Sequence, residues 1–579
     1  MPQLRIGLAQ MNSTVGDIDG NLISALDWCA KAAAAGCHLV ILPEMVLTGY
    51  PIEDLALRQS FQEASKQAAD NFAGMLALRG FGDLAVVFGY LDAHSTESKL
   101  GEPQGRPLNA AAVAHDGRIH ARYYKHHLPN YGVFDEFRYF LPGQDSAAVR
   151  ICGIDVAIAI CEDIWQEGGP VAKIADQKPG LLVVINGSPF EVDKEDARLE
   201  LVQKRAKQAN TTIAYVNLVG AQDELVFDGD SMVVDASGEL ISRAPMFQEG
   251  ILLTDLDLPA APVEPQLADG TAVSVLSEWP VSPYLPAKPA IATRPNDVEM
   301  QYQAVVVGLR DYVVKNGFKS VVLGISGGID SALVAAIACD AIGRDNVHGV
   351  LMPSKFSSSH SITDAEDLAR RLVIEHQTIS IQDFVDSYHA KIELTGLAAE
   401  NLQARARGVT LMALSNQHGH LVLTTGNKSE LAVGYSTIYG DAVGGYAPIK
   451  DVFKTLVWEM SRWRNAIAES RGETPPIPVN SIEKEPSAEL RPDQKDADSL
   501  PDYILLDQLL DAYVEEDLGK ADLLAIGFSE ELIDRVIRLV DAAEFKRRQY
   551  PPGPKISKRA FGRDRRLPIT NQWREKTSE

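Results

Sequence analysis

The sequence predicts an α/β fold that is distributed over two domains. Its 579 residues exceed what one hydrophobic core usually serves. In the first half, short apolar runs such as residues 156–160 and 181–185 alternate with helical stretches. In the second half, a glycine-rich turn joins an apolar run to a helical segment. This alternation is typical of strands that are buried on both faces of a sheet and connected by helices.

Composition narrows the classes of protein that fit. The chain has a formal net charge of -24, with 45% hydrophobic and 23% charged residues. This balance is ordinary for a globular protein and argues against broad binding to nucleic acid or anionic membranes. No apolar run approaches the roughly 18 residues of a membrane span, and the first residues form a strand-like run rather than a signal peptide. We therefore expect a cytoplasmic protein with neither nucleic-acid nor membrane partners.

The spacing of the cysteines argues against a disulfide-linked protein and against a zinc-binding protein. The five cysteines lie at positions 29, 37, 152, 161 and 339, and no two of them form a CxxC pair. The sequence therefore predicts neither a disulfide framework nor a zinc site. We expect most of these cysteines to be buried and inert, so a reactive one must be identified from the residues around it.

Proline marks the predicted boundary between the domains. Residues 259–295 carry eight prolines and little helical or strand periodicity, which predicts an extended connection. Residues 1–258 form the first predicted domain, and residues 296–579 form the second. The second begins with a helical stretch, residues 298–315, that leads to an apolar strand at residues 320–323.

Three functional groups of the first domain follow apolar strands, where α/β folds tend to place active sites. They are Glu44, Lys125 and Cys161. A thiol that attacks an amide carbonyl needs a base to take its proton and a donor to hold the oxyanion. Glu44 suits the first role, and Lys125 with the backbone N–H of Glu162 suits the second. Taken singly, Glu44 could be a loop acid, Lys125 a surface lysine and Cys161 a buried core cysteine.

The motifs around these residues resemble the nitrilase, or carbon-nitrogen hydrolase, superfamily. They read Leu-Pro-Glu at 42–44, Lys-His-His-Leu-Pro at 125–129 and Cys-Glu-Asp at 161–163, in the order of that superfamily's Glu-Lys-Cys triad. The resemblance implies an amide hydrolase with a nitrilase-like α/β sandwich fold. Its glutaminase branch implies further residues that hold L-glutamine or orient the triad: Tyr131, Ser188, Lys194, Glu136 and Glu162.

The glycine-rich turn of the second domain has the features of a phosphate site. Residues 324–331 read Gly-Ile-Ser-Gly-Gly-Ile-Asp-Ser. Glycines let backbone N–H groups approach a phosphate closely, and a helix N-terminus favours negative charge. Asp330 makes sense beside phosphates mainly if a divalent cation lies between them. The lysine of a Walker A motif is missing, which disfavours ordinary γ-phosphate hydrolysis. The simpler interpretation is a turn with no ligand.

This turn resembles the SGGxDS signature of the ATP pyrophosphatases, which cleave ATP between its α and β phosphates to adenylate an acceptor. Later motifs resemble the NAD synthetase family, at residues 401–408, 424–435, 439–441 and 484–490. The resemblance implies a Rossmann-like parallel sheet that amidates deamido-NAD with Mg²⁺ and ATP. Together with the first domain it implies the last step of NAD biosynthesis, with ammonia drawn from L-glutamine.

The same resemblance assigns individual residues. The implied ATP contacts are Gly324, Ile325, Ser326, Gly327, Gly328, Ile329, Asp330, Ser331, Thr425 and Lys454. The implied deamido-NAD contacts are Asn401, Glu430 and Lys546, and the implied Mg²⁺ ligands are Asp330 and Glu430. Taken singly, Asn401, Lys454 and Lys546 keep a simpler interpretation as surface or helix-face residues.

A glutaminase and an amide-forming synthetase on one chain lead to a hypothesis about ammonia. Since ammonium is not a nucleophile, we expect an internal, water-poor tunnel that delivers ammonia unprotonated. Family resemblance also implies a homo-oligomer. One rival interpretation is a nitrilase fused to a different ATP-dependent amidase or a tRNA-modifying enzyme, which the acidic charge disfavours. The other is a nucleotide-sensing regulator with inactive sites, which the presence of Cys161, Asp330 and Glu430 disfavours.

Overall fold

The computed structural model describes residues 1–94, 98–491 and 494–573. Both helices and strands occur throughout, so the predicted α/β class is confirmed. The chain folds into two compact units, whose bounds are Met1–Gln222 with Val226–Pro295 for the first and Asp223–Leu225 with Asn296–Glu579 for the second.

The first unit contains two large sheets. One has the strand order β14-β1-β2-β3-β4-β5, and the other has the order β13-β12-β9-β8-β7-β6-β15. In each sheet the central strands, β1-β2-β3 and β9-β8-β7, run parallel. The bounds are β1 (Gln3–Gln10), β2 (Leu39–Ile41), β3 (Ala85–Ala93), β4 (Pro107–His115), β5 (Arg118–Tyr124), β6 (Ala148–Ile151), β7 (Ile154–Ile160), β8 (Leu181–Asn186), β9 (Thr212–Asn217), β12 (Met232–Val234), β13 (Leu240–Arg243), β14 (Gly250–Asp257) and β15 (Val273–Val275).

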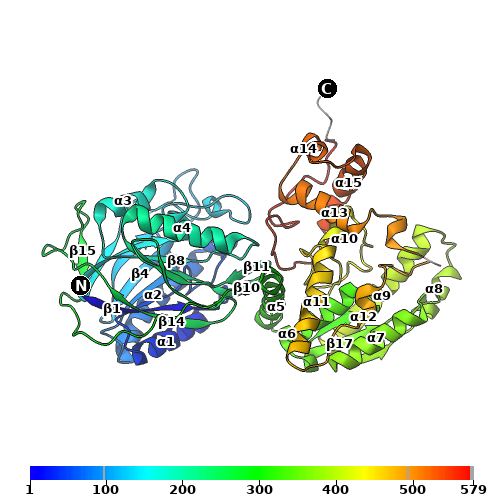
Figure 1. Ribbon diagram of the computed structural model, residues 1–579, viewed down its shortest axis with the longest axis horizontal. Coiled ribbons are helices and arrows are strands. Elements are labelled where there is room, and N and C mark those ends of the chain that lie inside the picture. Colours follow the sequence, from blue (N-terminus) through cyan, green and yellow to red (C-terminus); the bar gives the residue numbers. More distant parts are fainter. Residues whose placement is uncertain (95–97, 492–493, 574–579) are drawn as a thin grey trace. The chain divides into compact units, whose positions relative to one another are not determined.

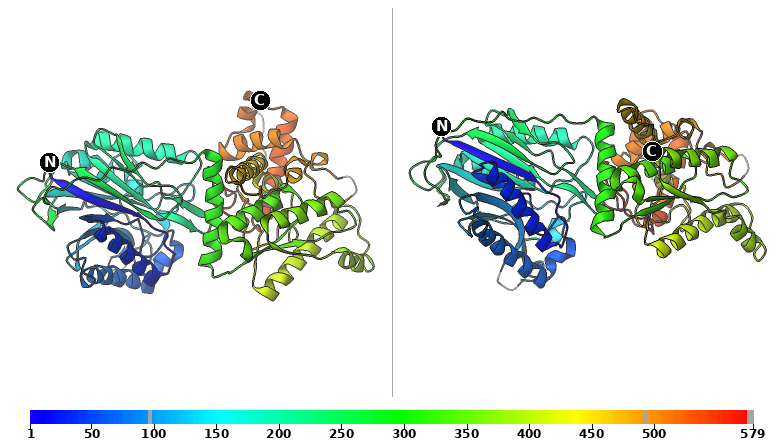
Figure 2. Two further views of the ribbon diagram at one scale, coloured as in Figure 1. Left: turned by 60° about the horizontal axis from the view of Figure 1, so that its bottom comes forward. Right: turned by 90° about the horizontal axis from the view of Figure 1, so that it is seen from below.

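These two sheets pack face to face between two layers of helices. Since successive side chains of a strand point to opposite faces, Ile6 and Leu8 of β1 share one core with Ile158 and Ile160 of β7. The outer faces pack against α1 and α2 on one side and α3 and α4 on the other, as Figures 1 and 2 show. The helices are α1 (Ile18–Ala34), α2 (Gln59–Leu78), α3 (Gly169–Gln177) and α4 (Lys194–Ala209). The predicted α/β sandwich is therefore confirmed.

The proline-rich segment 259–295 contains a strand that periodicity did not reveal. Its residues Val273–Val275, β15, pair in parallel with β6 at the edge of the second sheet. A strand of three residues is too short for a recognisable alternation of polar and apolar side chains. A small hairpin in the chain, β10 (Val219–Gln222) and β11 (Leu225–Asp228), forms a separate two-stranded sheet.

The second unit is built on a parallel sheet with the order β18-β17-β16-β19. From β16 the chain proceeds to β17 and β18 on one side, and it then crosses to β19 on the other. The carboxyl end of β16 is therefore a topological switch point, where open α/β sheets bind ligands. The bounds are β16 (Val321–Gly324), β17 (Val347–Leu351), β18 (Glu375–Thr378) and β19 (Leu421–Val422).

Helices surround this sheet and form a second core beside it. One sheet face packs on α9 through Val322, Val350 and Leu411, and α10, α13, α14 and α15 share a separate core (Figure 1). In the described part of the chain, no helix meets the length and apolarity that crossing a bilayer requires. The helices are α5 (Asp297–Lys315), α6 (Ile329–Ile342), α7 (Ser359–Leu372), α8 (Gln382–His389), α9 (Leu397–His418), α10 (Lys428–Val433), α11 (Lys454–Ser470), α12 (Val479–Glu483), α13 (Tyr503–Leu510), α14 (Lys520–Ala525), α15 (Glu530–Ala542) and α16 (Glu544–Arg547).

Candidate active sites

Cys161 stands at a strained turn directly after β7. The strand ends at Ile160, and Cys161 begins a short 3-10 turn with φ = 43°, in the left-handed region that non-glycine residues rarely adopt. Such strain costs free energy and is typical of functional sites. The side chain is buried, with 5% of the residue exposed. The fold therefore holds a thiol at a sharp turn out of the sheet core.

Glu44, Lys125 and Glu136 form one buried cluster. The Lys125 ammonium donates to Glu44 Oε1 at 2.8 Å and to Glu136 Oε1 at 2.9 Å. All three residues are at most 2% exposed. Two carboxylates against one ammonium leave the cluster with a net negative charge when all are ionised. Such a cluster is costly to bury unless it is fully hydrogen-bonded.

Neighbouring groups hydrogen-bond three of the four carboxylate oxygens, and Glu136 Oε2 has no hydrogen-bond partner among the described residues. Asn109 Nδ2 donates to Glu44 Oε1 at 2.7 Å, and the Gly187 N–H donates to Glu44 Oε2 at 2.7 Å. The Tyr50 hydroxyl donates to Glu136 Oε1 at 2.9 Å. Because each oxygen of Glu44 has its own donor, the carboxylate is held in one orientation.

Asp163 ties the Cys161 turn to the segment that carries Lys125. It is fully buried and accepts a hydrogen bond from the Ile160 N–H, at the end of β7, at 3.0 Å. It also accepts three from the lysine segment: the Tyr123 hydroxyl at 2.7 Å, the His126 N–H at 3.0 Å and the His127 N–H at 2.8 Å. One carboxylate thus fixes the turn at Cys161 relative to Lys125.

Burial sets the protonation of the cluster. Desolvation opposes a charged Lys125, yet the carboxylates of Glu136 and Glu44 hold its pKa well above the ordinary value. Burial, together with the charge of Glu44, raises the pKa of the Cys161 thiol well above its usual range. Burial also raises the pKa of Glu136 to about 7. The resting thiol is therefore protonated, and a base must take its proton during attack.

The predicted glutamine contacts lie in two places around this cluster. The Tyr131 hydroxyl donates to both oxygens of Glu162, at 2.9 and 3.1 Å, which places it beside the residue after Cys161. The Phe134 ring packs against Tyr131 with a centroid separation of 5.7 Å, and Lys194 Nζ lies 5.7 Å from the same ring. Ser188 is buried just after β8, next to the Gly187 that contacts Glu44.

The second candidate site is the turn from β16 into α6, at the switch point of the parallel sheet. The Ser331 hydroxyl donates to the Gly328 carbonyl at 3.0 Å, and the Gly328 N–H donates to Ser326 Oγ at 3.2 Å. These bonds hold the turn between β16 and the first residues of α6 in a compact conformation. The loop geometry suits an anion held by backbone N–H groups.

Gly327 is the position where this loop most needs glycine. Its φ is +82°, and a Cβ added there would overlap the carbonyl oxygen of Ser361. We predict that Gly327→Ala displaces the loop and weakens ATP binding by at least about tenfold, since a strained position costs roughly 1–3 kcal/mol. Gly317→Ala is the matched control, because that glycine also has positive φ but no atom near its Cβ position. Equal effects of both variants on the ATP concentration dependence would contradict this interpretation.

Asp330 and Glu430 meet at Lys454. The Lys454 ammonium contacts Asp330 Oδ2 and lies 3.5 Å from Glu430 Oε1. Asn427 Nδ2 donates to Asp330 Oδ1 at 2.9 Å, and the Lys454 N–H donates to Ser429 Oγ at 2.9 Å. Burial and the charge of Asp330 raise the pKa of Glu430 to about 8. Two carboxylates from different elements therefore share one lysine.

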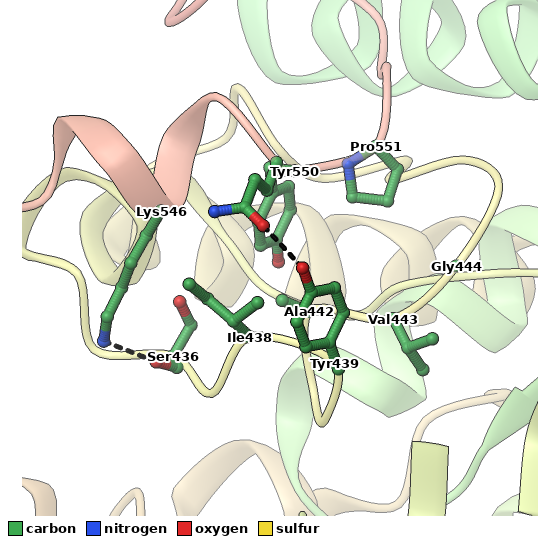
Figure 3. A pocket seen from close by; sticks show the side chains of 10 residues that line it. Ser436, Ile438, Tyr439, Ala442, Val443, Gly444, Lys546, Tyr550 and Pro551 are labelled. Carbon is green, nitrogen blue, oxygen red and sulfur yellow. Dashed lines mark hydrogen bonds between the residues drawn. The ribbon is translucent and has the colours of Figure 1, made fainter. Parts of the chain in front are cut away.

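Lys546 and Asn401 both hold the segment after α10. Lys546 Nζ donates to the carbonyls of Gly434 and Ser436, each at 2.7 Å, and Thr437 Oγ1 donates to Asn401 Oδ1 at 2.8 Å. Figure 3 shows Lys546 beside Ser436 at one end of a pocket. The residues that line this pocket are Ser436, Ile438, Tyr439, Ala442, Val443, Gly444, Lys546, Gln549, Tyr550 and Pro551.

Thr425 lies close to the same pocket. It precedes Gly426, and the hydroxyl of the pocket residue Tyr550 lies against Gly426, where a Cβ would overlap it. Across the pocket, the Tyr439 hydroxyl donates to Gln549 Oε1 at 2.8 Å (Figure 3). Lys546 lines the cavity, and Asn401 contacts the same segment that follows α10, although more than 100 residues separate the two along the sequence.

Comparison with known proteins covers both units. Residues 5–261 match the family described as carbon-nitrogen hydrolase, and residues 301–550 match the family described as NAD synthase. A protein named glutamine-dependent NAD(+) synthetase from Acinetobacter baylyi is 42% identical over 583 residues, which covers 99% of each chain. Its namesake from Thermotoga maritima is 44% identical over 592 residues, which covers 99% of this chain and 100% of that protein. The chain belongs to the glutamine-dependent NAD(+) synthetases.

Solved members of this synthetase family agree in fold. A glutamine-dependent NAD+ synthetase from Acinetobacter baumannii, described in complex with ADP, aligns with a TM-score of 0.73 and 39% identity over 99% of this chain and 100% of that one. A second synthetase, from Cytophaga hutchinsonii, aligns with a TM-score of 0.79 over 98% of both chains, and its 21% identity supports the fold alone.

Several groups in the first site were not predicted from the sequence. Asn109, Tyr50 and Gly187 contact the clustered carboxylates, and Asp163 joins the Cys161 turn to the segment that carries Lys125. One signal was present, because Asn109 is a polar residue within the otherwise apolar run of β4. A buried polar side chain in such a run needs a partner, but the sequence does not say which one.

Proposed function

We propose that this chain converts deamido-NAD to NAD, with ATP as co-substrate and L-glutamine as the source of ammonia. The products are then AMP, pyrophosphate and glutamate. The observation that carries the proposal is that one chain holds a buried cysteine next to a Glu-Lys cluster in its first unit and a glycine-rich anion loop next to a carboxylate pair in its second. Membership of the synthetase family along nearly the whole chain supports the same reaction.

In the first unit, we assign Cys161 as the nucleophile and Glu44 as the base. As the thiol proton moves to Glu44, Sγ bonds to the amide carbon of glutamine, and Lys125 with the Glu162 N–H stabilises the oxyanion. Glu44 returns the proton to the leaving nitrogen, so that the C–N bond breaks and ammonia departs. Water, deprotonated by the same carboxylate, then hydrolyses the thioester to glutamate.

The fixed orientation of Glu44 matters for each of these proton transfers. A general base acts well only within hydrogen-bond reach of the proton it takes. Donors from Asn109 and Gly187 hold its two oxygens, and Asp163 holds the turn of the nucleophile relative to the lysine. The resting thiol has a raised pKa, which is consistent with proton transfer during the attack rather than before it.

In the second unit, we assign residues 324–331 and Lys454 to the phosphates of ATP, with Thr425 as a further contact. The carboxylate of deamido-NAD attacks the α-phosphorus, pyrophosphate leaves, and ammonia displaces AMP from the acyl adenylate. Backbone N–H groups of the loop stabilise the departing pyrophosphate. Asn401, Glu430 and Lys546 are assigned to deamido-NAD; Lys546 lines the pocket, and Asn401 contacts Thr437 between two of its lining residues.

The residues also fit a divalent cation. Asp330 and Glu430 converge on Lys454, and burial, followed by the charge of Asp330, raises the pKa of Glu430. Among the described residues, no group of three or more His, Cys, Asp or Glu has a metal-binding arrangement. Two carboxylates completed by phosphate oxygens are the usual surroundings of Mg²⁺. Asp330 and Glu430 would hold Mg²⁺, which would neutralise charge on the phosphates.

Glutamine hydrolysis is expected to weaken in acid. Because the pKa of Glu136 is raised to about 7, this group takes up its proton as pH falls through about 7 rather than through the ordinary range of a glutamate. The protonated form no longer stabilises the Lys125 ammonium by charge. We predict that kcat/KM for glutamine falls about tenfold per pH unit below pH ~7. The check is a pH profile of glutamate release, and a profile that stays flat down to pH ~5.5 would show that Glu136 does not control the rate.

We also propose a cytoplasmic homo-oligomer. The support for assembly is a row of exposed apolar side chains on and after α8, in which Phe384, Tyr388 and Ile392 are each more than half exposed. Phe384 and Tyr388 are four residues apart and lie on one face of α8, and Ile392 follows just beyond the end of the helix. Light scattering of the purified chain tests this, and a monomeric mass at micromolar concentration would refute it.

A product assay tests the proposed reaction. Deamido-NAD, Mg-ATP and glutamine are incubated with the protein, and NAD, AMP, pyrophosphate and glutamate are quantified together. The proposal expects NAD, AMP and pyrophosphate in equal amounts. Release of glutamate without NAD would retain the first site and refute deamido-NAD as the acceptor.

A further inference from the structure

Ser188 is clamped by a side chain that the proposed mechanism does not use. The Ser188 N–H donates to Asn217 Oδ1 at 2.9 Å, and Asn217 Nδ2 donates to the Ser188 carbonyl at 3.1 Å. Asn217 is the last residue of β9, and Ser188 follows the neighbouring strand β8. The primary amide thus continues the pairing of the two strands beyond their ends. Only a group with a donor and an acceptor on one planar head satisfies both backbone atoms.

Asn217 is itself oriented by a set of buried polar residues. Its Nδ2 also donates to Asp228 Oδ1 at 3.3 Å, and Arg198 Nη1 donates to Asp228 Oδ2 at 2.9 Å. The Asn217 N–H donates to Ser231 Oγ at 3.0 Å. All four of these residues are fully buried. A fully buried ion pair contributes little net stability, but its geometry is fixed because each partner is costly to leave unpaired.

The clamped segment also touches the catalytic base. Gly187 lies between the end of β8 and Ser188, and its N–H donates to Glu44 Oε2 at 2.7 Å. Glu44 keeps Asn109 and Lys125 as further partners. A disturbance of the clamp therefore moves Ser188 freely, while the base retains two of its three donors. The expected consequence is a loss of substrate affinity that exceeds the loss of chemical rate.

We propose that Asn217, oriented by Asp228 and Arg198, is a positioning residue that sets the affinity for glutamine through Ser188. The inference rests on the proposed glutaminase function and on Ser188 as a substrate contact. It adds a residue that acts through Ser188 and determines how tightly the amide substrate is held.

The test is Asn217→Asp, which keeps size and shape. It retains an acceptor for the Ser188 N–H, removes the donor to the Ser188 carbonyl, and places a second carboxylate against Asp228. We expect the KM for glutamine to rise about tenfold or more and kcat to change less than about threefold, since an unpaired buried group and a repelled charge each weaken the clamp. NAD formation with ammonium is expected at the wild-type level. Asn210→Asp, the same change at an exposed residue after α4, is the matched control.

Alkylation of Cys161 separates positioning from a merely structural role. In the Asn217→Asp variant, iodoacetamide is expected to modify Cys161 at the wild-type rate, as measured by intact mass. An unchanged KM, or a parallel fall of kcat, 1/KM and alkylation, overturns the inference. If Asn217→Asp also loses ammonium-dependent activity, Asn217→Ser, which introduces no charge, must give the same split between KM and kcat. A wild-type chain that releases no glutamate refutes the proposed function instead.

Discussion

Replacement of Cys161 by alanine is expected to abolish NAD formation from glutamine and to leave NAD formation from ammonium intact. The variant removes the sulfur that forms the thioester, and neither Glu44 nor Lys125 supplies another nucleophile of that strength. Loss of the nucleophile is expected to lower the glutamine-dependent rate by at least about a thousandfold. The measurement is the rate of NAD formation with saturating glutamine or ammonium, for wild type and variant side by side.

Cys152→Ala is the matched control for this prediction. Cys152 is buried in the turn between β6 and β7 of the same unit. Its sulfur contacts the Ser277 hydroxyl, and among the described residues no hydrogen bond joins it to Glu44, Lys125 or Glu136. Its removal is expected to leave glutamine use within about twofold of wild type, because the change is one sulfur atom at a site remote from the chemistry. Glutamine-dependent activity that survives Cys161→Ala would move the nucleophile elsewhere.

Replacement of Asp330 by asparagine is expected to remove NAD formation with either nitrogen source. The substitution keeps the size of the side chain but deletes the charge that pairs with Lys454 and that a divalent cation needs. A drop of at least about a hundredfold is expected, as for the loss of one electrostatic contact at a phosphate-transfer centre. Glutamate release is expected to remain measurable, since Cys161 and its cluster belong to the first unit.

Asp345→Asn serves as the control for Asp330→Asn. Asp345 is an exposed acid of the same unit, in the turn after α6, so its neutralisation changes the net charge equally without touching the loop. Comparable losses for both variants would show that overall charge, and not the site at residue 330, governs the rate. A titration of Mg²⁺ against activity distinguishes weakened cation binding, which excess metal rescues, from a lost phosphate contact.

The sequence alone predicted that Cys161 and the glycine-rich turn directly follow strands. The apolar run 154–160 ends where β7 ends, which left Cys161 at the first position beyond the sheet. The glycine loop similarly follows β16 and precedes α6. Such local signals arise because strand burial and helix starts depend on neighbouring residues.

Relations between distant segments were not accessible in this way. Lys454 and Asp330 are 124 residues apart along the chain, and their contact depends on how α11 packs beside α6. Likewise, Asn217 and Ser188 meet only because β9 pairs with β8 in one register. Sequence patterns predict that each strand exists, but the order of strands in a sheet is a property of the whole unit.

Isotope transfer from glutamine to NAD tests the central claim most directly. The wild-type protein is given deamido-NAD, Mg-ATP and glutamine labelled with ¹⁵N at the amide, in the presence of unlabelled ammonium, and the mass of the NAD is measured. The account predicts NAD that carries the label, with AMP formed in equal amount. Unlabelled NAD would contradict the use of ammonia from the Cys161 site, and the absence of NAD would contradict deamido-NAD as the acceptor.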